Sequence, residues 1–199
     1  ALLDDGPVIP NSDGAGEIVS IGEGVSPSRV GERVWVYNAQ YGRQLGTSAE
    51  YVCLPSDYAI ILPESADYNT GAMMGVPAMT AHRCVFTDGS VADQTLLITG
   101  GAGRVGYYAI QWAKHHGAAV IATASSAGSR EQCKNAGADL VVDHPSDDSV
   151  KEILDYTDGK KIDRIIEGDF GANLLSVLDI LKTGGTIATY SSMTDMNPS

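Results

Sequence analysis

A short glycine pattern constrains the fold of this chain more than any other feature. The pattern is G-x-G-x-x-G, and its residues are Gly101, Ala102, Gly103, Arg104, Val105 and Gly106. A β-rich run, residues 95–99, precedes it, and a helical run, residues 107–116, follows it. A strand, such a turn and a helix in succession are typical of a dinucleotide-binding site. We therefore expect these six residues to bind a dinucleotide; the plainer alternative is a structural turn in an α/β protein.

Each glycine has its own physical role in such a turn. Gly101 permits the tight change of direction, Gly103 lets a pyrophosphate approach the backbone, and Gly106 lets helix and strand pack closely. The first N–H groups of the helix lack intrahelical acceptors, and the helix dipole places positive charge at the same end. Anionic phosphates are therefore expected at the start of the helix.

Strand-like and helical runs alternate along the C-terminal two thirds of the chain. The strand-like runs span residues 94–99, 119–124, 139–142, 162–167 and 186–190. Alternating strands and helices build a parallel sheet with helices on both faces. The sequence therefore predicts an α/β fold, a doubly wound parallel (Rossmann) sheet, over residues 66–199.

The helical runs carry apolar stripes and glycine stop signals. One stripe at the helical period consists of Val105, Ala109, Trp112, Ala113 and His116, and a second of Leu174, Leu178 and Leu181. Glycine readily adopts the left-handed conformation that often ends a helix. The glycines expected at helix ends are Gly117, Gly137, Gly159 and Gly184.

Residues 1–65 are β-like and rich in turns. The strand-like runs span residues 17–21, 31–37 and 49–54, with Val34 and Val36 on one face of the second. A turn is expected at residues 22–24, and prolines at positions 55 and 63 punctuate the region. Such punctuation is typical of a small antiparallel sheet or barrel. We therefore predict a partial, mostly antiparallel β domain over residues 1–65.

Charge and cysteine content exclude several classes of partner. The chain has 199 residues, 43% of them hydrophobic, and a formal net charge of −12. So acidic a surface repels nucleic acids and anionic membranes, and we expect neither as a partner. Three dispersed cysteines fit a reducing compartment, and no apolar run is long enough to span a bilayer. We expect a cytoplasmic protein that acts on a small molecule.

The end of the second strand of the Rossmann sheet distinguishes between the two nicotinamide cofactors. Enzymes that prefer NAD have an acidic residue there, which accepts from the ribose 2′-hydroxyl. Here Ser125 and Ser126 stand at that position, and Arg130 precedes the first carboxylate, Glu131. Hydroxyl groups and a guanidinium suit a 2′-phosphate, so we predict NADPH. The alternative is that Ser126 or Ser129 only caps the next helix and that Arg130 is solvated.

Two further basic side chains are candidates for contacts to phosphate. Arg104 lies inside the glycine turn, where it either pairs with the pyrophosphate or points to water. His144 follows the third strand of the sheet, where it either reaches the adenosine phosphate or has a structural role.

The sequence does not favour a metal site or an acyl-enzyme. Zinc sites need clustered Cys and His ligands, whereas the three cysteines are dispersed. His115 and His116 are adjacent, so their rings would point in different directions from a helix. No G-x-S-x-G nucleophile motif is present. The expected chemistry is therefore metal-free hydride transfer.

Three N-terminal motifs resemble those of a known family. Residues 10–19, PNSDGAGEIV, resemble the early strand motif of the zinc-free medium-chain dehydrogenase/reductases, specifically the NADPH:quinone oxidoreductase and zeta-crystallin group. Residues 31–34 are similar to that family's G-D-R-V turn, and residues 46–51 to its G-x-x-A-E-Y. Zinc-binding members carry a His-Glu pair where this chain has Ser12 and Asp13, and Asn11 replaces a usual glycine. The resemblance implies that residues 1–65 are a partial GroES-like catalytic domain.

Two C-terminal motifs extend the resemblance. Residues 75–82, GVPAMTAH, resemble a helix start of the form G-x-P-x-L-T-A, which implies that Thr80 contacts the cofactor near its nicotinamide. Residues 184–192 resemble the strand whose exit holds the carboxamide, which implies that Tyr190 and Ser192 bind it. The resemblance further implies sequence before Ala1 and after Ser199, including the last strand of the cofactor-binding sheet, and a homo-oligomer at full length.

The combined expectation is an oxidoreductase that transfers hydride from NADPH to a quinone or a conjugated carbonyl. No residue is assigned as catalytic, because solvent could protonate a reduced quinone. Tyr41 and Arg43, in the loop after the second N-terminal strand, are candidates for lining the substrate cleft. Three alternatives stay open: an enone or enoyl-thioester reductase, a non-catalytic, crystallin-like NADPH-binding protein, and a fragment that binds cofactor weakly or not at all.

Overall fold

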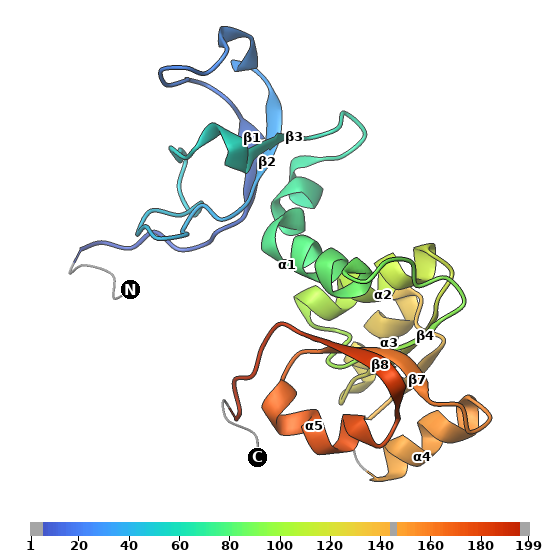
Figure 1. Ribbon diagram of the computed structural model, residues 1–199. Helices are drawn as coiled ribbons and strands as arrows, with labels where there is room; N and C mark the ends of the chain where they lie inside the picture. The colour runs from blue at the N-terminus through green and yellow to red at the C-terminus, as the bar shows by residue number, and fades with distance from the viewer. Residues whose placement is uncertain (1–5, 144–146, 196–199) are drawn as a thin grey trace. The chain divides into compact units, whose positions relative to one another are not determined.

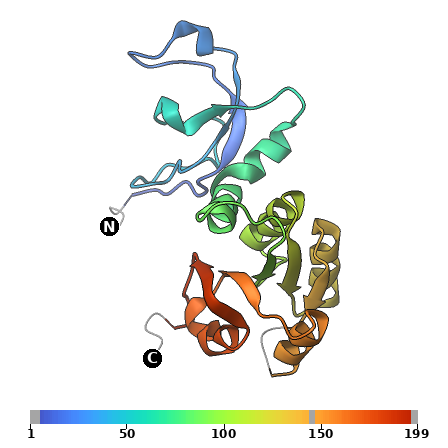
Figure 2. The ribbon, with the colours of Figure 1, turned by 45° about the vertical axis from the view of Figure 1, so that its right-hand side comes forward.

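The computed structural model describes residues 6–143 and 147–195. By its contacts the chain divides into two compact units, one up to Met79 and one from Thr80 on (Figures 1 and 2). Met79 and Thr80 both lie within helix α1 (Tyr68–Phe86). The domain boundary between residues 65 and 66 stays a prediction.

The C-terminal unit is built on a five-stranded parallel sheet. Its strands are β4 (Thr95–Ile98), β5 (Ala119–Thr123), β6 (Leu140–Val142), β7 (Ile162–Glu167) and β8 (Leu181–Thr189), in the order β6-β5-β4-β7-β8. The helices between them are α2 (Arg104–His115), α3 (Ala127–Ala136), α4 (Asp147–Tyr156) and α5 (Phe170–Leu178). The predicted doubly wound α/β fold is confirmed. Because β4 has β5 on one side and β7 on the other, the strand order reverses between β4 and β7.

Alternation along the buried strands builds two apolar layers. In β4, Leu96 and Ile98 belong to the layer covered by α1, α2 and α3, whereas Leu97 belongs to the layer covered by α4 and α5. All three side chains are fully buried. Continuous apolar runs of this kind are typical of parallel strands covered on both faces. The parallel sheet therefore lies between two packed apolar layers, and this core carries the loops at the strand ends.

Three of the four predicted helix-stop glycines lie beyond helix ends. Gly117, Gly137 and Gly159 follow α2, α3 and α4 with φ values of +82°, +110° and +75°. The prediction for Gly184 is wrong, because this residue lies inside β8, with φ +77°. There it permits an irregular register, in which Ile162 pairs with Leu181 but Arg164 pairs with Thr186.

The second predicted helical stripe is also wrong. Helix α5 ends at Leu178, and Leu181 instead opens β8. Val177 is fully buried in α5, whereas Leu178 is 48% exposed. The helix ends early because Leu181 pairs with Ile162 of β7. The stripe therefore combined residues from two different elements.

The N-terminal unit contains a small antiparallel sheet in the order β1-β2-β3. The strands are β1 (Gly14–Glu17), β2 (Arg33–Val36) and β3 (Ala59–Ile61), with 3₁₀ turns at Pro27–Arg29 and Ser56–Tyr58. Val34 and Val36 of β2 are both buried, as their alternation predicts. The antiparallel character of this region is confirmed.

Two of the predicted N-terminal strands are placed wrongly. Residues 49–54 form no strand, because residues 59–61 take the edge of β2 through pairs such as Val34 with Ile61. Tyr51, in the predicted strand, is 74% exposed. The strand predicted at residues 17–21 ends at Glu17, whose pairing with Arg33 is the last of the β1–β2 ladder. The turn at residues 22–24 is present, with a hydrogen bond from Val25 N to Gly22 O.

Candidate functional site

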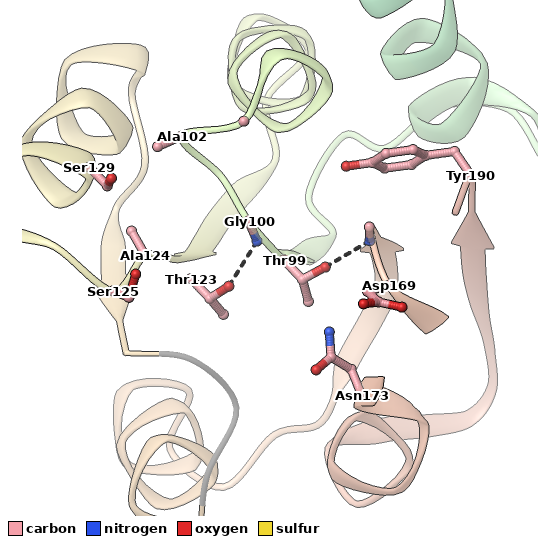
Figure 3. A pocket seen from close by; sticks show the side chains of 12 residues that line it. Thr99, Gly100, Ala102, Thr123, Ala124, Ser125, Ser129, Asp169, Asn173 and Tyr190 are labelled. Atoms are coloured by element: carbon pink, nitrogen blue, oxygen red, sulfur yellow. Dashed lines mark hydrogen bonds between the residues drawn. The ribbon is translucent and has the colours of Figure 1, made fainter. Parts of the chain in front are cut away.

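A cavity of about 460 Å³ opens where the strands of the parallel sheet end (Figure 3). Its lining comes from the ends of β4, β5, β7 and β8 and from the starts of the following helices: Thr99, Gly100, Ala102, Gly103, Thr123, Ala124, Ser125, Ser129, Gly168, Asp169, Asn173 and Tyr190. The cavity thus lies at the point where the strand order reverses. Open α/β sheets bind their ligands in this crevice.

The glycine turn is packed too tightly for side chains at two of its positions. A Cβ atom on Gly101 would lie 2.8 Å from Ala122 Cβ, and one on Gly106 would lie 2.5 Å from Gly100 O. Gly106 therefore allows the close packing predicted for it. The left-handed conformation of the turn is taken by Gly100, with φ +59°, and not by Gly101. Gly101 is instead needed for close packing.

The start of α2 is open toward the cavity. The helix begins at Arg104, three residues earlier than predicted, and its N-cap Gly103 provides no capping side chain. Among the described residues beyond its chain neighbours, a Cβ on Gly103 would have one atom within 4 Å, Gly100 O at 3.1 Å, and Gly103 itself lines the cavity. Ala102 also lines the cavity. An anion could therefore approach the first N–H groups of α2.

The two remaining residues of the turn, Arg104 and Val105, are not among those that line the cavity. Val105 is partly buried against the apolar layer under α2. Arg104 is exposed, and no hydrogen bond of its guanidinium is seen within the described residues. The pyrophosphate and water alternatives for Arg104 therefore both stand.

The four polar residues after β5 have different surroundings. Ser125 and Ser129 line the cavity. Ser126 caps α3, accepting from Ser129 N at 3.1 Å. Arg130 Nη2 donates to Asp143 Oδ2 at 2.9 Å, and it does not line the cavity. The structure thus brings Ser125 to the cavity, whereas Ser126 has the capping role and Arg130 forms an ion pair while its side chain stays 38% exposed to solvent.

Tyr190 and Gly168 form the opposite wall of the cavity. A Cβ on Gly168 would lie 2.8 Å from the Tyr190 hydroxyl oxygen, so the phenol end of Tyr190 lies close to the glycine. Burial, together with Cys84 and Glu167, raises the pKa of the Tyr190 phenol. Tyr190 therefore presents a neutral hydroxyl to the cavity.

Ser192 does not line the cavity. Its hydroxyl accepts from Gly171 N at 3.0 Å and donates to Asp195 O. Gly171 lies in the first turn of α5, so Ser192 satisfies a backbone donor at the start of that helix. The prediction that Ser192 holds a carboxamide has no counterpart in the described contacts.

Thr80 lines a second cavity of about 430 Å³ within the same unit. The other residues of this cavity come from α1, the turn after it, β7 and β8: Arg83, Cys84, Thr87, Asp88, Arg164, Thr186, Ile187, Ala188, Thr189 and Tyr190. Tyr190 is common to both cavities. Thr80 and Tyr190, both assigned by resemblance to the nicotinamide end, thus share a cavity wall.

The remaining expectations concern His144, Tyr41, Arg43, a metal site and a membrane-spanning helix. His144 lies outside the described residues. Tyr41 is 77% exposed and Arg43 Nε donates to Leu45 O, and neither lines the two cavities. Within residues 6–143 and 147–195, no cluster of three His, Cys, Asp or Glu side chains could hold a metal ion. No helix in the described part of the chain has the length and apolarity to cross a membrane.

The buried thiols are not activated. Burial raises the pKa of Cys84, against a smaller opposing effect of Arg164. Burial also raises the pKa of Cys133, whose sulfur packs beneath Gly101. Since the thiolate is the nucleophilic form, neither cysteine is suited to covalent catalysis.

Sequence reasoning missed the residues that close the cavity from β7 and α5. Glu167 is fully buried below Gly168, and Asn173, in α5, is 4% exposed. A signal was available, because Glu167 directly follows two buried isoleucines at the end of β7, a position where a charge is costly unless it is bonded.

Comparison with known proteins agrees with this architecture. The alcohol dehydrogenase GroES-like domain family matches residues 3–64, and the zinc-binding dehydrogenase family matches residues 105–198. The quinone oxidoreductase of Rattus norvegicus is 33% identical over 182 residues, which are 91% of this chain and 54% of the relative.

Solved structures extend the match to the fold. Mycobacterial Rv1454c complexed with NADPH superposes with a TM-score of 0.81 at 28% identity, over 94% of this chain and 58% of that one. An NAD-dependent alcohol dehydrogenase superposes with a TM-score of 0.83 at 27% identity, over 94% and 61%. The chain belongs to the medium-chain dehydrogenase/reductase superfamily. It spans about half the length of the curated relatives that it matches.

Within this dehydrogenase/reductase chain, the early strand motif contacts the helix motif. Asp13 Oδ1 accepts from Val76 N at 2.9 Å. The backbone of α1 departs from helical geometry at Gly75, with φ −16° and ψ −128°, and Pro77 follows. Proline is favoured at the first turn of a helix. Residues 75–77 thus start a new helical segment inside α1, which agrees with the expected helix start, and Asp13 caps it.

Proposed function

We propose that this medium-chain dehydrogenase/reductase chain belongs to a zinc-independent oxidoreductase that transfers hydride from NADPH to a quinone or a conjugated carbonyl. The observation that carries the proposal is the open N-terminus of α2 at the reversal point of the sheet. Gly103 places no side chain there, and the cavity in front of it measures about 460 Å³. The quinone oxidoreductase relative supports the choice of acceptor.

The residues present fit a nicotinamide dinucleotide. The cavity extends from Ser125 at the end of β5, past Gly103, to Tyr190 at the end of β8. In such sheets the adenosine ribose lies at the end of the second strand and the pyrophosphate at the helix start. NADPH supplies the hydride when it is bound. The protein binds and orients the two reactants, and the neutral hydroxyl of Tyr190 is a donor for the polar group at that end.

The choice of NADPH rests on the end of β5. Among the residues that the structure describes, no carboxylate lines the cavity at Ser125 or Ser129, where an acid would accept from a 2′-hydroxyl and repel a 2′-phosphate. Arg130 lies in the first turns of α3, the helix that also contains Ser129. It forms an ion pair with Asp143, whose side chain is 61% exposed. Such an exposed ion pair contributes about 0–1 kcal/mol, so a 2′-phosphate could compete for the guanidinium.

At the nicotinamide end of the cofactor, the proposed chemistry uses Thr80 and Tyr190. We propose that both contact the nicotinamide end of the cofactor, since they share the wall of the second cavity. A catalytic acid is not needed for quinone reduction, because solvent can protonate the reduced product. A conjugated carbonyl would need a proton at carbon, and Tyr190 is the neutral hydroxyl at that end.

Two measurements on the chain test the proposal. The first is the binding of NADPH and NADH, and the second is steady-state NADPH oxidation with panels of quinones and enones. We expect tighter binding of NADPH than of NADH, and turnover with quinones. Turnover with enones alone would move the assignment to an enone or enoyl-thioester reductase. Tight NADPH binding without turnover would remove the enzymatic part of the proposal.

A further inference from the structure

A buried carboxylate ties together the elements that form one wall of the nucleotide cavity. Glu167, the last residue of β7, is 0% exposed. Its Oε1 atom accepts hydrogen bonds from Thr99 Oγ1 at 2.9 Å, Asp169 N at 2.6 Å and Asn173 Nδ2 at 2.8 Å. These donors belong to the end of β4, the turn after β7 and helix α5. One carboxylate oxygen therefore fixes three separate segments around the point where the strand order reverses.

The same network shapes the turn that faces the cavity. Thr99 Oγ1 accepts from Gly168 N at 2.9 Å while it donates to Glu167. Gly168 and Asp169 both line the cavity, and both have their N–H groups bonded within this network. The position of the Gly168–Asp169 turn thus depends on the Glu167 carboxylate.

Two acceptors in the network lack a donor. Glu167 Oε2 and Asn173 Oδ1 are buried and have no hydrogen-bond partner among the described residues. Because Asn173 Nδ2 is bonded to Glu167, its Oδ1 is left as an acceptor in a residue that lines the cavity. Buried polar atoms in native proteins are normally paired. The arrangement therefore suits a ligand that brings a hydroxyl donor.

The geometry of the cavity identifies which part of the ligand this is. Gly103, at the start of α2, takes the pyrophosphate, and Ser125, at the end of β5, lies where the adenosine ribose is expected. The wall formed by Gly168, Asp169 and Asn173 is on the other side of the reversal point. The part of a dinucleotide left for this wall is the ribose that carries the nicotinamide, with its two hydroxyl groups.

We propose that Glu167 is a positioning residue for the nicotinamide ribose. It orients Asn173 so that Oδ1 accepts from a ribose hydroxyl, and it holds the Gly168–Asp169 turn against that sugar. This inference rests on the proposed NADPH function. It adds a ribose contact that neither the glycine turn nor the residues after β5 provide.

The test compares two ligands that differ by the nicotinamide half. NADPH spans the whole cavity, whereas 2′,5′-ADP occupies only the adenosine side. For Glu167→Ala and Asn173→Ala we expect the Kd for NADPH to rise about tenfold, which corresponds to the loss of one net hydrogen bond of about 1.4 kcal/mol. The Kd for 2′,5′-ADP should stay within about twofold of wild type, since that ligand touches neither residue.

Two further variants separate positioning from stability. Glu167→Gln keeps an acceptor oxygen for the three donors, so it should restore most of the NADPH affinity lost in Glu167→Ala. Asp163→Ala removes a carboxylate from the same strand that bonds Thr95 N and Lys182 instead. This control should lower Tm without changing the ratio of the two Kd values.

Each outcome supports or overturns the inference. If Glu167→Ala does not fold, a selective loss of NADPH affinity in Asn173→Ala still supports the inference. Equal losses for both ligands, or no loss for either, would overturn the positioning role while the NADPH function stood. If the wild-type chain bound neither 2′,5′-ADP nor NADPH, the proposed function would be overturned, and the inference with it.

Discussion

The Asp13 carboxylate caps the helical segment that begins at Val76, with 2.9 Å between Asp13 Oδ1 and Val76 N. Gly75 lies directly against it, because a Cβ at this position would stand 2.1 Å from Asp13 Cγ. Two motifs that are 63 residues apart are therefore complementary in shape as well as in hydrogen bonding. The Asp13 carboxylate can reach Val76 N in this position because Gly75 has no side chain.

This dependence predicts non-additive stability effects. Asp13→Ala removes a helix cap and should cost about 1 kcal/mol of unfolding free energy. Gly75→Ala forces an extra methyl group against the carboxylate and should cost about 2–3 kcal/mol. In the Asp13→Ala background the same Gly75 change should cost less, because the Cγ and Oδ1 contacts at 2.1 Å are gone while the Cβ contact at 2.6 Å remains. A double-mutant cycle by urea denaturation measures this coupling, and additive values would contradict the packing argument.

The glycine turn should tolerate substitution unequally. Gly106→Ala places a methyl group 2.5 Å from Gly100 O, so it should destabilise the fold by about 2 kcal/mol or more. Gly128→Ala is the matched control, because this glycine lies inside α3 with open space around it. It should stabilise the protein by about 0.5–1 kcal/mol. Thermal denaturation of both variants checks the difference, and similar Tm shifts would count against the close packing.

Cofactor choice should depend on Arg130 and its partner. Arg130→Ala should weaken NADPH binding about tenfold and leave NADH binding unchanged, because only NADPH carries the 2′-phosphate. Asp143→Asn frees the guanidinium from its ion pair and should modestly strengthen NADPH binding. Calorimetric titration with both cofactors measures these changes. If neither Arg130→Ala nor Ser125→Ala alters NADPH affinity, the phosphate site lies elsewhere.

Acid should remove the contribution of Asp163 to stability. Burial by itself would raise the pKa of Asp163, but the hydrogen bond and charge of Lys182 and the N–H of Thr95 lower it overall. A carboxylate whose pKa is lowered in the folded state stabilises the protein above its unfolded pKa of about 3.9. That contribution is lost as the pH falls through the folded-state pKa. The Tm difference between wild type and Asp163→Asn should therefore be present at neutral pH and vanish in acid; a constant difference would contradict this assignment.

The sequence predicted the parts of the fold that depend on local patterns. The apolar run around Leu97 and its following glycines indicated a parallel strand and a turn into a helix, and both are present. The run at residues 49–54 was also predicted to be a strand but forms none, because residues 59–61 pair with β2 instead. Competition between segments for one strand edge is a tertiary effect that local propensity does not contain.

The candidate site was predictable only where backbone conformation leaves a sequence signal. Gly103 and Ser125 were identified from motif position, and both line the cavity. Ser192 was assigned by resemblance, but its hydroxyl bonds the first turn of α5. Glu167 and Asn173 meet only because β7 and α5 fold together, so no spacing rule could have connected them to Thr99, 68 residues away from the carboxylate.

Equilibrium binding of NADPH to the wild-type chain and to Gly103→Val shows whether the cofactor binds at the start of α2. The account predicts saturable binding to wild type, seen as a change in cofactor fluorescence, and a large loss of affinity in the variant. The Cβ of the variant would lie 3.1 Å from the backbone oxygen of Gly100, a tight contact, so the Tm of the variant is measured alongside to show that it is folded. Equal NADPH affinity of a folded Gly103→Val protein, or no saturable binding to wild type, would contradict a cofactor site at the start of α2.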